Sequence, residues 1–196
     1  MTEDASSTVG GARAESWVEL LPARAERDPR ELIARAIERK GGAARLASIR
    51  TIKTRATTSG RRMDISIEYP NLHLVEYYTG DDVIERLLVD TEAGTAQREG
   101  GGRVVQVSKS ETATLLSSAR GSSTSLLRAA AAGSTNLRHV GDAKVNGQPA
   151  HAIELVTPEH FTAILFVDAE TADVVALRYG ADGAQTTVVE SDFRDV

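Results

Sequence analysis

Apolar and polar positions follow two different periods along the chain, and the first period is helical. A stripe of helical spacing begins after Asp28, which suits an N-cap, and Pro29, which suits the first helical position. The stripe ends at Gly41-Gly42, which stop a helix. Its apolar members are Leu32, Ile33, Ala36 and Ile37. The pattern predicts an amphipathic helix that is followed by a second short helical turn.

After Arg50 the period changes to two, which is typical of strands with one wet face. Turn residues separate three such runs, and residues 91–107 continue them as a further hairpin. Connections this short join antiparallel strands, because a parallel return needs a long crossover. The three runs are residues 63–69, 72–79 and 83–90.

A helical segment interrupts the strands in the middle of the chain. Ser108 and Glu111 form a capping-box pattern that opens it, Gly121 interrupts it, and Gly133 ends it. A second block of strands follows, in which Asn146-Gly147 is a preferred two-residue hairpin turn. The strands of this block are predicted at residues 136–145, 148–157, 161–168, 174–179 and 185–194.

The start of the chain has a different character. Residues 1–15 are small and polar without periodicity, which predicts a flexible arm. A short apolar knot follows, made of Trp17, Val18, Leu20 and Leu21. We expect it either to pack on the domain as one helical turn or to remain an arm with exposed apolar side chains. The predicted organisation is therefore an N-terminal arm at 1–27 and one domain at 28–196.

Composition excludes several classes of function. The net charge is −5 with scattered basic residues, which argues against a nucleic-acid partner. Cysteine is absent, so disulfides, zinc–thiolate sites and thiol nucleophiles are excluded. No apolar run approaches 18 residues, so no transmembrane segment is predicted.

The sequence shows no catalytic or metal-binding motif. The four histidines, His73, His139, His151 and His160, lack ligand spacing. Two of them could still come together in the folded chain and bind a metal ion. The favoured interpretation is that each histidine is hydrogen-bonded in the core or exposed to solvent. The serines lack a nucleophile-elbow motif, and the acidic pairs fall at hairpin ends, where solvated turn residues are expected. We expect no metal, no cofactor and no enzymatic activity.

Several segments carry a family resemblance. These segments are residues 31–37, which lead to Gly41-Gly42, and residues 45–51, 142–155 and 166–171. They resemble bacterial outer-membrane lipoprotein-sorting (LolA/LolB-like) domains, and the resemblance extends over about residues 28–194. The resemblance implies an α+β fold: a strongly curved antiparallel sheet, or half-open β-barrel. An N-terminal helix and a mid-chain helical segment would lie on its concave face.

In carrier members of that family, an apolar hollow between sheet and helices takes lipid acyl chains. Here the residues expected to line such a hollow are Ile67, Tyr69, Leu74, Leu87, Leu115, Leu126, Leu127 and Phe166. The simpler interpretation is that these side chains fill the core.

The expected function is a non-catalytic binding or carrier domain for a lipid or other apolar ligand in the cell envelope, with residues 109–132 as the gate. The alternative is a protein–protein interaction module of an envelope assembly without a small ligand. We expect a periplasmic or envelope location if a leader has been removed, and a cytoplasmic one if Met1 is the native start.

Overall fold

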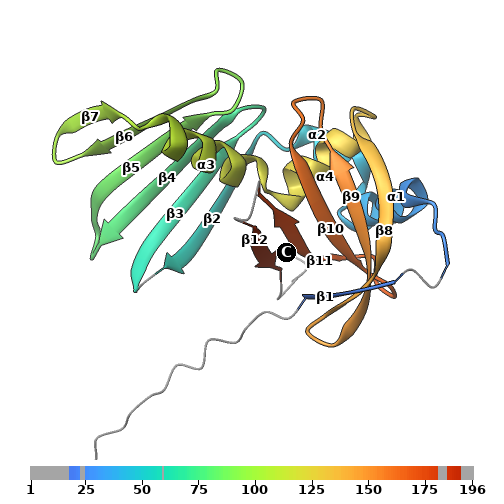
Figure 1. The fold of residues 1–196 in the computed structure, drawn as a ribbon. Coiled ribbons are helices and arrows are strands. Elements are labelled where there is room, and N and C mark those ends of the chain that lie inside the picture. Colours follow the sequence, from blue (N-terminus) through green and yellow to red (C-terminus); the bar gives the residue numbers. More distant parts are fainter. Residues whose placement is uncertain (1–17, 23–24, 59, 181–184, 191–196) are drawn as a thin grey trace, which may run out of the picture.

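The computed structural model describes residues 18–22, 25–58, 60–180 and 185–190. Within these residues the chain forms four helices and twelve strands. The strands make two six-stranded antiparallel sheets (Figure 1). The first sheet has the order β2-β3-β4-β5-β6-β7, and the second has the order β1-β8-β9-β10-β11-β12.

The opening helices form as the sequence predicts. In α1 (Pro29–Arg39), the Asp28 carboxylate accepts a hydrogen bond from the backbone N–H of Arg30 at 2.9 Å. Gly41 then takes a φ of 94°, a left-handed conformation that suits glycine, and α2 (Gly42–Ser48) follows at once. These helices place one apolar stripe against the second sheet.

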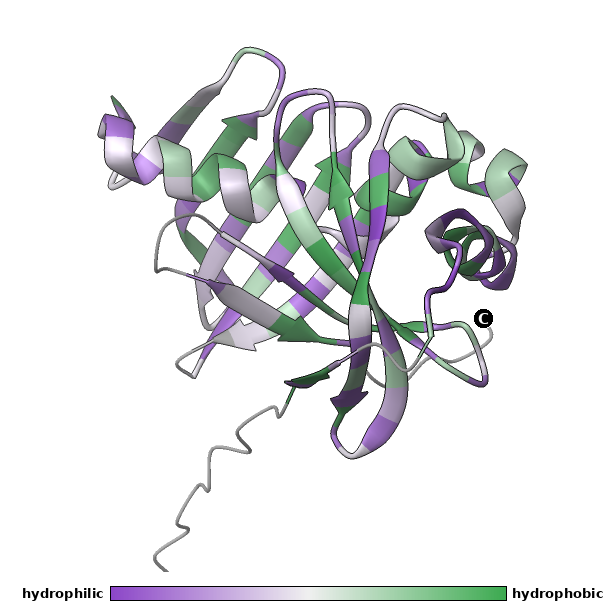
Figure 2. Cartoon of the chain, turned by 45° about the vertical axis from the view of Figure 1, so that its right-hand side comes forward, coloured by the Kyte–Doolittle hydropathy of each residue, from purple (hydrophilic) through white to green (hydrophobic). Residues whose placement is uncertain are grey.

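Each strand of the first sheet pairs with its neighbour in the chain. Its strands are β2 (Thr51–Thr58), β3 (Arg61–Glu68), β4 (Leu72–Thr79), β5 (Asp82–Asp90), β6 (Thr95–Gly100) and β7 (Arg103–Gln106). Polar and apolar residues alternate along these strands (Figure 2). One face carries cross-strand ion pairs, such as Arg86–Glu76 at 2.9 Å and Arg55–Asp64 at 3.0 Å. The opposite face is called the inner face, because a helix packs on it.

That helix is α3 (Lys109–Arg120), which lies across the first sheet in Figure 1 and packs over β5 and β6. The Ser108 hydroxyl accepts a hydrogen bond from the N–H of Glu111 at 3.2 Å, as the capping pattern predicts. Gly121 ends α3, Ser122 caps the next helix, and α4 (Ser123–Ala131) runs on to the second sheet. The helical middle thus connects the two sheets.

The second sheet is built around the hairpin of β8 and β9. Its strands are β1 (Val18–Leu21), β8 (Asn136–Val145), β9 (Gln148–Val156), β10 (Thr162–Asp168), β11 (Val174–Tyr179) and β12 (Thr186–Val189). Strand β10 lies inside the sheet, between β9 and β11, which agrees with the apolar residues on both of its faces. The predicted helical turn at the apolar knot is wrong for residues 18–21, because they pair with β8 as a strand. The side chain of Trp17 lies outside the described residues.

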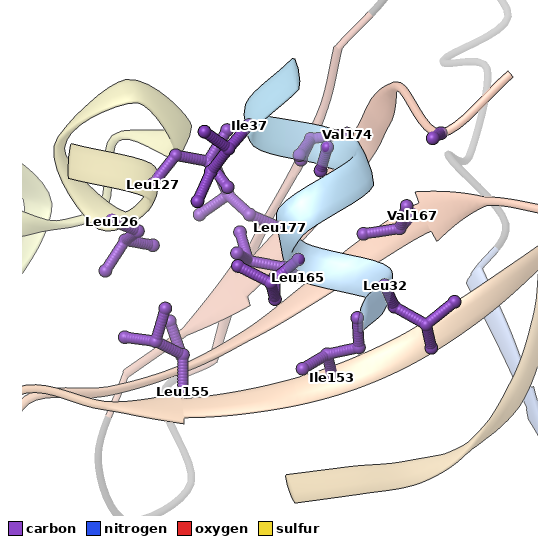
Figure 3. Close-up of a cluster of buried hydrophobic side chains, with 14 of the residues drawn as sticks. Leu32, Ile37, Leu126, Leu127, Ile153, Leu155, Leu165, Val167, Val174 and Leu177 are labelled. Carbon is purple, nitrogen blue, oxygen red and sulfur yellow. The ribbon is translucent and has the colours of Figure 1, made fainter. Parts of the chain in front are cut away.

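The main core fills the space between the second sheet and the helices α1, α2 and α4 (Figure 3). Helix α1 contributes Leu32 and Ile37, and α4 contributes Leu126 and Leu127. The strands supply the opposite wall with Ile153, Leu155, Leu165, Val167, Val174 and Leu177. A smaller cluster on the far face of the same sheet gathers around Phe166.

The α+β fold with curved antiparallel sheet is confirmed, and so is the position of both helical segments. The strand pattern did not predict that the strands divide between two sheets. Among the described residues no helix is long and apolar enough to span a membrane. The predicted arm at 1–15 and the end of the last predicted strand at 191–194 lie outside the described residues.

Candidate functional site

An open cleft of about 570 Å³ lies where the first sheet, the α3–α4 joint and the β9–β10 connection meet. This volume lies within the usual range of small-molecule sites. The residues that line the cleft are Pro70, Asn71, His73, Thr91, Glu92, Ala119, Arg120, Ser125, Leu126, Ala129, Thr157, Glu159 and Phe161. They come from β4 and two turns of the first sheet, from both middle helices and from the β9–β10 connection, so only the complete fold forms the cleft.

Hydrogen bonds fix the helices to the first sheet on both sides of the cleft. The Arg120 guanidinium donates to the carbonyl oxygen of Thr91 at 3.1 Å. The Tyr69 hydroxyl lies 3.2 Å from the Ser125 hydroxyl, so one donates to the other. These bonds hold the wall of the cleft at two points, one on α3 and one on α4.

Arg128 provides a third connection near this wall. Its guanidinium lies 4.2 Å from the centre of the Tyr69 ring, close enough for a cation–π contact. It also donates to the backbone carbonyls of Leu46 and Ile49, the second at 3.0 Å. Arg128 therefore connects α4 with the end of α2 and with Tyr69 of the first sheet.

The cleft combines an apolar floor with polar groups. Leu126 and Phe161 are buried, and the Phe161 ring packs against Tyr179 with centroids 6.0 Å apart. His73 is also buried, and burial lowers the pKa of its imidazole below the ordinary value of 6.5, so the ring is neutral at pH 7. Arg120 supplies a positive charge at the same hollow. Two carboxylates, Glu92 and Glu159, also line it. Such a surface suits an amphipathic molecule with an apolar body and a polar head group.

The inner face of the first sheet extends the apolar surface beyond the cleft. Strand pairing puts Ile67 of β3 directly opposite His73 of β4, and the next row pairs Ile65 with Val75. These three apolar side chains are only half-buried, because α3 packs farther along the sheet, over β5 and β6. The neighbourhood of the cleft therefore has apolar surface that the described part of the chain does not fully cover.

The structure brings together only some of the residues predicted to line a hollow. Leu126 lines the cleft, and Tyr69 contacts the lining residue Ser125. Ile67 lies on the inner face in the row of His73. Leu87 is buried on the same face, where its partner in β4 is Val75.

Four predicted residues lie elsewhere. Leu127 is fully buried in the main core, and Leu115 packs in a small cluster between α3 and the first sheet. Leu74 lies on the face opposite to the inner face, since it pairs with Ser66 and Leu88. Phe166 is 0% exposed on the far face of the second sheet. The expectation that Leu74 and Phe166 point into a common hollow therefore differs from the structure.

Sequence reasoning missed the polar groups of the cleft. His73, Arg120 and Ser125 lie on three different elements, and no local motif connects them. Among the described residues, one group of three His, Asp or Glu side chains converges closely enough to hold a metal ion. That group lies outside the cleft, on the β8–β9 hairpin.

No protein-family model matches the chain, and no curated protein sequence matches it. Among solved structures, it resembles a LolA superfamily protein from Nitrosomonas europaea, with 11% identity over 87% of this chain and 80% of that one and a TM-score of 0.46. It also resembles an outer membrane lipoprotein-sorting protein domain from Vibrio parahaemolyticus, with 13% identity, coverages of 84% and 80%, and a TM-score of 0.46.

A third similar structure is a DUF1329 family protein from Desulfovibrio piger, with 12% identity, coverages of 78% and 74%, and a TM-score of 0.44. The lipoprotein-sorting family that the sequence resembles is thus also among its structural neighbours.

Proposed function

We propose that this protein is a non-catalytic binding domain for an amphipathic, lipid-like ligand, and that the cleft is its binding site. The observation that carries the proposal is the composition of the cleft: a buried floor with Leu126 and Phe161, and the positive charge of Arg120 at the same hollow. An acyl chain would lie on the floor and along the half-buried inner face. An anionic head group would be neutralised by Arg120.

The α3–α4 segment would act as the gate. Both of its helices line the cleft, through Ala119 and Arg120 on one side of the joint and Ser125 and Leu126 on the other. A ligand that binds in the cleft would therefore contact both helices of this segment. The cell-envelope location that the sequence resemblance implies belongs to the same proposal.

The first test is native mass spectrometry of the purified protein, followed by lipid extraction and displacement of a fluorescent fatty acid. Ala129→Phe would fill part of the cleft, and we expect it to weaken probe binding at least tenfold. Ala132→Phe is the matched control, because Ala132 is exposed just after α4 and does not line the cleft. A wild-type protein that carries no lipid and binds no probe would refute the proposal.

The charge of the head group can be tested separately. Arg120→Gln should weaken binding of a long-chain fatty acid more than binding of the corresponding alcohol, because only the acid carries the charge that Arg120 neutralises. Arg103→Gln removes an exposed arginine from β7 and should change neither affinity. Equal losses for acid and alcohol in the Arg120 variant would contradict the assigned role.

A protein–protein interaction module is the second candidate function. It is favoured by β7, an edge strand of the first sheet on which every residue is exposed, including Val104 at 64% and Val105 at 50%. An exposed apolar edge strand can pair with a strand of another chain. Two results would favour this function over ligand binding. Native mass spectra would show the protein without a bound ligand, and the protein would capture a partner whose binding Val104→Lys abolishes.

A further inference from the structure

The hairpin of β8 and β9 brings three potential metal ligands to one face of the second sheet. Across the Asn146-Gly147 turn, Asp142 pairs directly with His151. His139 lies three positions before Asp142, and in a regular strand an odd spacing would put them on opposite faces. The pairing shifts between His139 and Gly141, so β8 has one extra residue there. This β-bulge restores both side chains to the same face.

The side chains of His139, Asp142 and His151, here called the His–Asp–His cluster, approach one another closely. One carboxylate oxygen of Asp142 lies 3.1 Å from Nδ1 of His151 and 4.0 Å from Nε2 of His139. One candidate ligand atom from each of the three residues lies within 4.8 Å of the other two. The two imidazole rings stand edge to face, with centroids 5.9 Å apart.

The His139 side chain has a buried nitrogen that the cluster itself does not hydrogen-bond. Its side chain is 4% exposed, and its Nε2 has no hydrogen-bond partner among the described residues. A buried polar nitrogen without a partner is unfavourable, and most native structures avoid it. The nitrogen lies 4.0 Å from the Asp142 carboxylate, which is beyond hydrogen-bond distance. A metal ion between them would satisfy it.

A second hollow of about 230 Å³ gives access to the cluster from solvent. Asp142 and His151 line it, together with Leu21 of β1. Arg27 and Lys144 line it too, so two positive side chains lie at this hollow. This hollow shares no lining residue with the cleft.

We propose that the His–Asp–His cluster binds a divalent transition-metal ion of the zinc type, with a fourth position open to the hollow. Two neutral imidazoles and one carboxylate form a common three-ligand set for zinc, whose bonds to N and O are about 2.0–2.2 Å. Two atoms that share such an ion lie at most about 4.2 Å apart, so small side-chain rotations would complete the site. Arg27 and Lys144 would favour an anion as the fourth ligand. This site is independent of the proposed lipid-like ligand.

The alternative is that the cluster binds no metal ion. His151 and Asp142 would then form a structural hydrogen bond in which His139 takes no part. Equilibrium dialysis of the tag-free full chain against Zn²⁺, with the metal counted by mass spectrometry, separates the two. We expect one Zn²⁺ per chain, and at least a tenfold loss of affinity in His139→Gln and Asp142→Asn. His160→Gln is the matched control, because His160 is exposed and does not belong to the cluster, and it should bind as the wild type does.

A second measurement remains informative if a polar variant folds poorly. His139→Leu removes the unpartnered nitrogen, so it should fold without metal and its melting temperature should not respond to Zn²⁺. The wild-type melting temperature should rise with Zn²⁺, because an ion that binds only the folded state stabilises it. The proposal is overturned if the wild type binds no stoichiometric Zn²⁺, or if His139→Leu binds and responds like the wild type.

Discussion

Gly121, at the joint between α3 and α4, lies against the ring of Tyr179. A Cβ atom added there would lie 2.4 Å from Cε1 and 2.5 Å from Cζ of Tyr179. Real Cβ atoms do not come this close, so the joint or the ring must move. The φ of Gly121 is −77°, which any residue adopts, so the expected effect of Gly121→Ala comes from this contact alone.

The cost follows from how little the ring can move. Tyr179 is 8% exposed and packs against Phe161 in the main core. Inserting a methyl group into such packing usually costs 1–3 kcal/mol, and we expect about 2 kcal/mol. For a chain of this size, that corresponds to a fall in melting temperature of about 4–8 °C.

Urea unfolding followed by circular dichroism measures this loss directly. Tyr179→Leu supplies the second arm of a double-mutant cycle, because it removes the ring that the new methyl group would meet. Gly121→Ala should cost much less in the Tyr179→Leu background than in the wild type. Additive effects, or no loss in Gly121→Ala itself, would refute the close contact as the reason for glycine at this joint.

Further predictions concern stability, pH and self-association. Leu127→Ala should cost 2–5 kcal/mol in urea unfolding, because Leu127 is fully buried, whereas Leu20→Ala at a 45% exposed position should cost under about 1 kcal/mol. Because burial lowers the pKa of His73, stability should be full above pH 6.5 and fall as pH drops below it, by at most about 1.4 kcal/mol per pH unit. His73→Gln should flatten that pH profile, and an unchanged profile would exclude His73 as its source. Val104→Lys should reduce self-association through the edge strand β7, measured as concentration-dependent light scattering. An increase in scattering would exclude β7 as the surface that self-associates.

Elements with local signals could be predicted from the sequence. Asp28 and Ser108 cap their helices as expected, and Asn146-Gly147 forms the hairpin turn. Each signal depends on residues within a few positions, so no knowledge of the fold is needed. The same hairpin turn even fixes Asp142 opposite His151 by counting along the two strands.

Features that depend on distant contacts could not be predicted. The β-bulge that turns His139 toward Asp142 has no strong local signature, so the His–Asp–His cluster was not predicted. Phe166 was assigned to the wrong face because β10 is apolar on both of its faces. Leu74 has the same difficulty, since β4 has apolar residues on both sides. The cleft unites residues from β4, α3, α4 and three connecting segments, which only the three-dimensional arrangement reveals.

The pairing of β1 with β8 has a consequence for the order in which the chain acquires its structure. All strand pairs of the first sheet join chain neighbours, so that sheet can form from short loop closures as soon as its residues have left the ribosome. The partner of β1, in contrast, is made only after the whole first sheet and the helical middle. Since domains fold as synthesis proceeds, β1 must wait for β8 and docks among the last elements. Its loss should then speed unfolding while leaving the folding rate nearly unchanged.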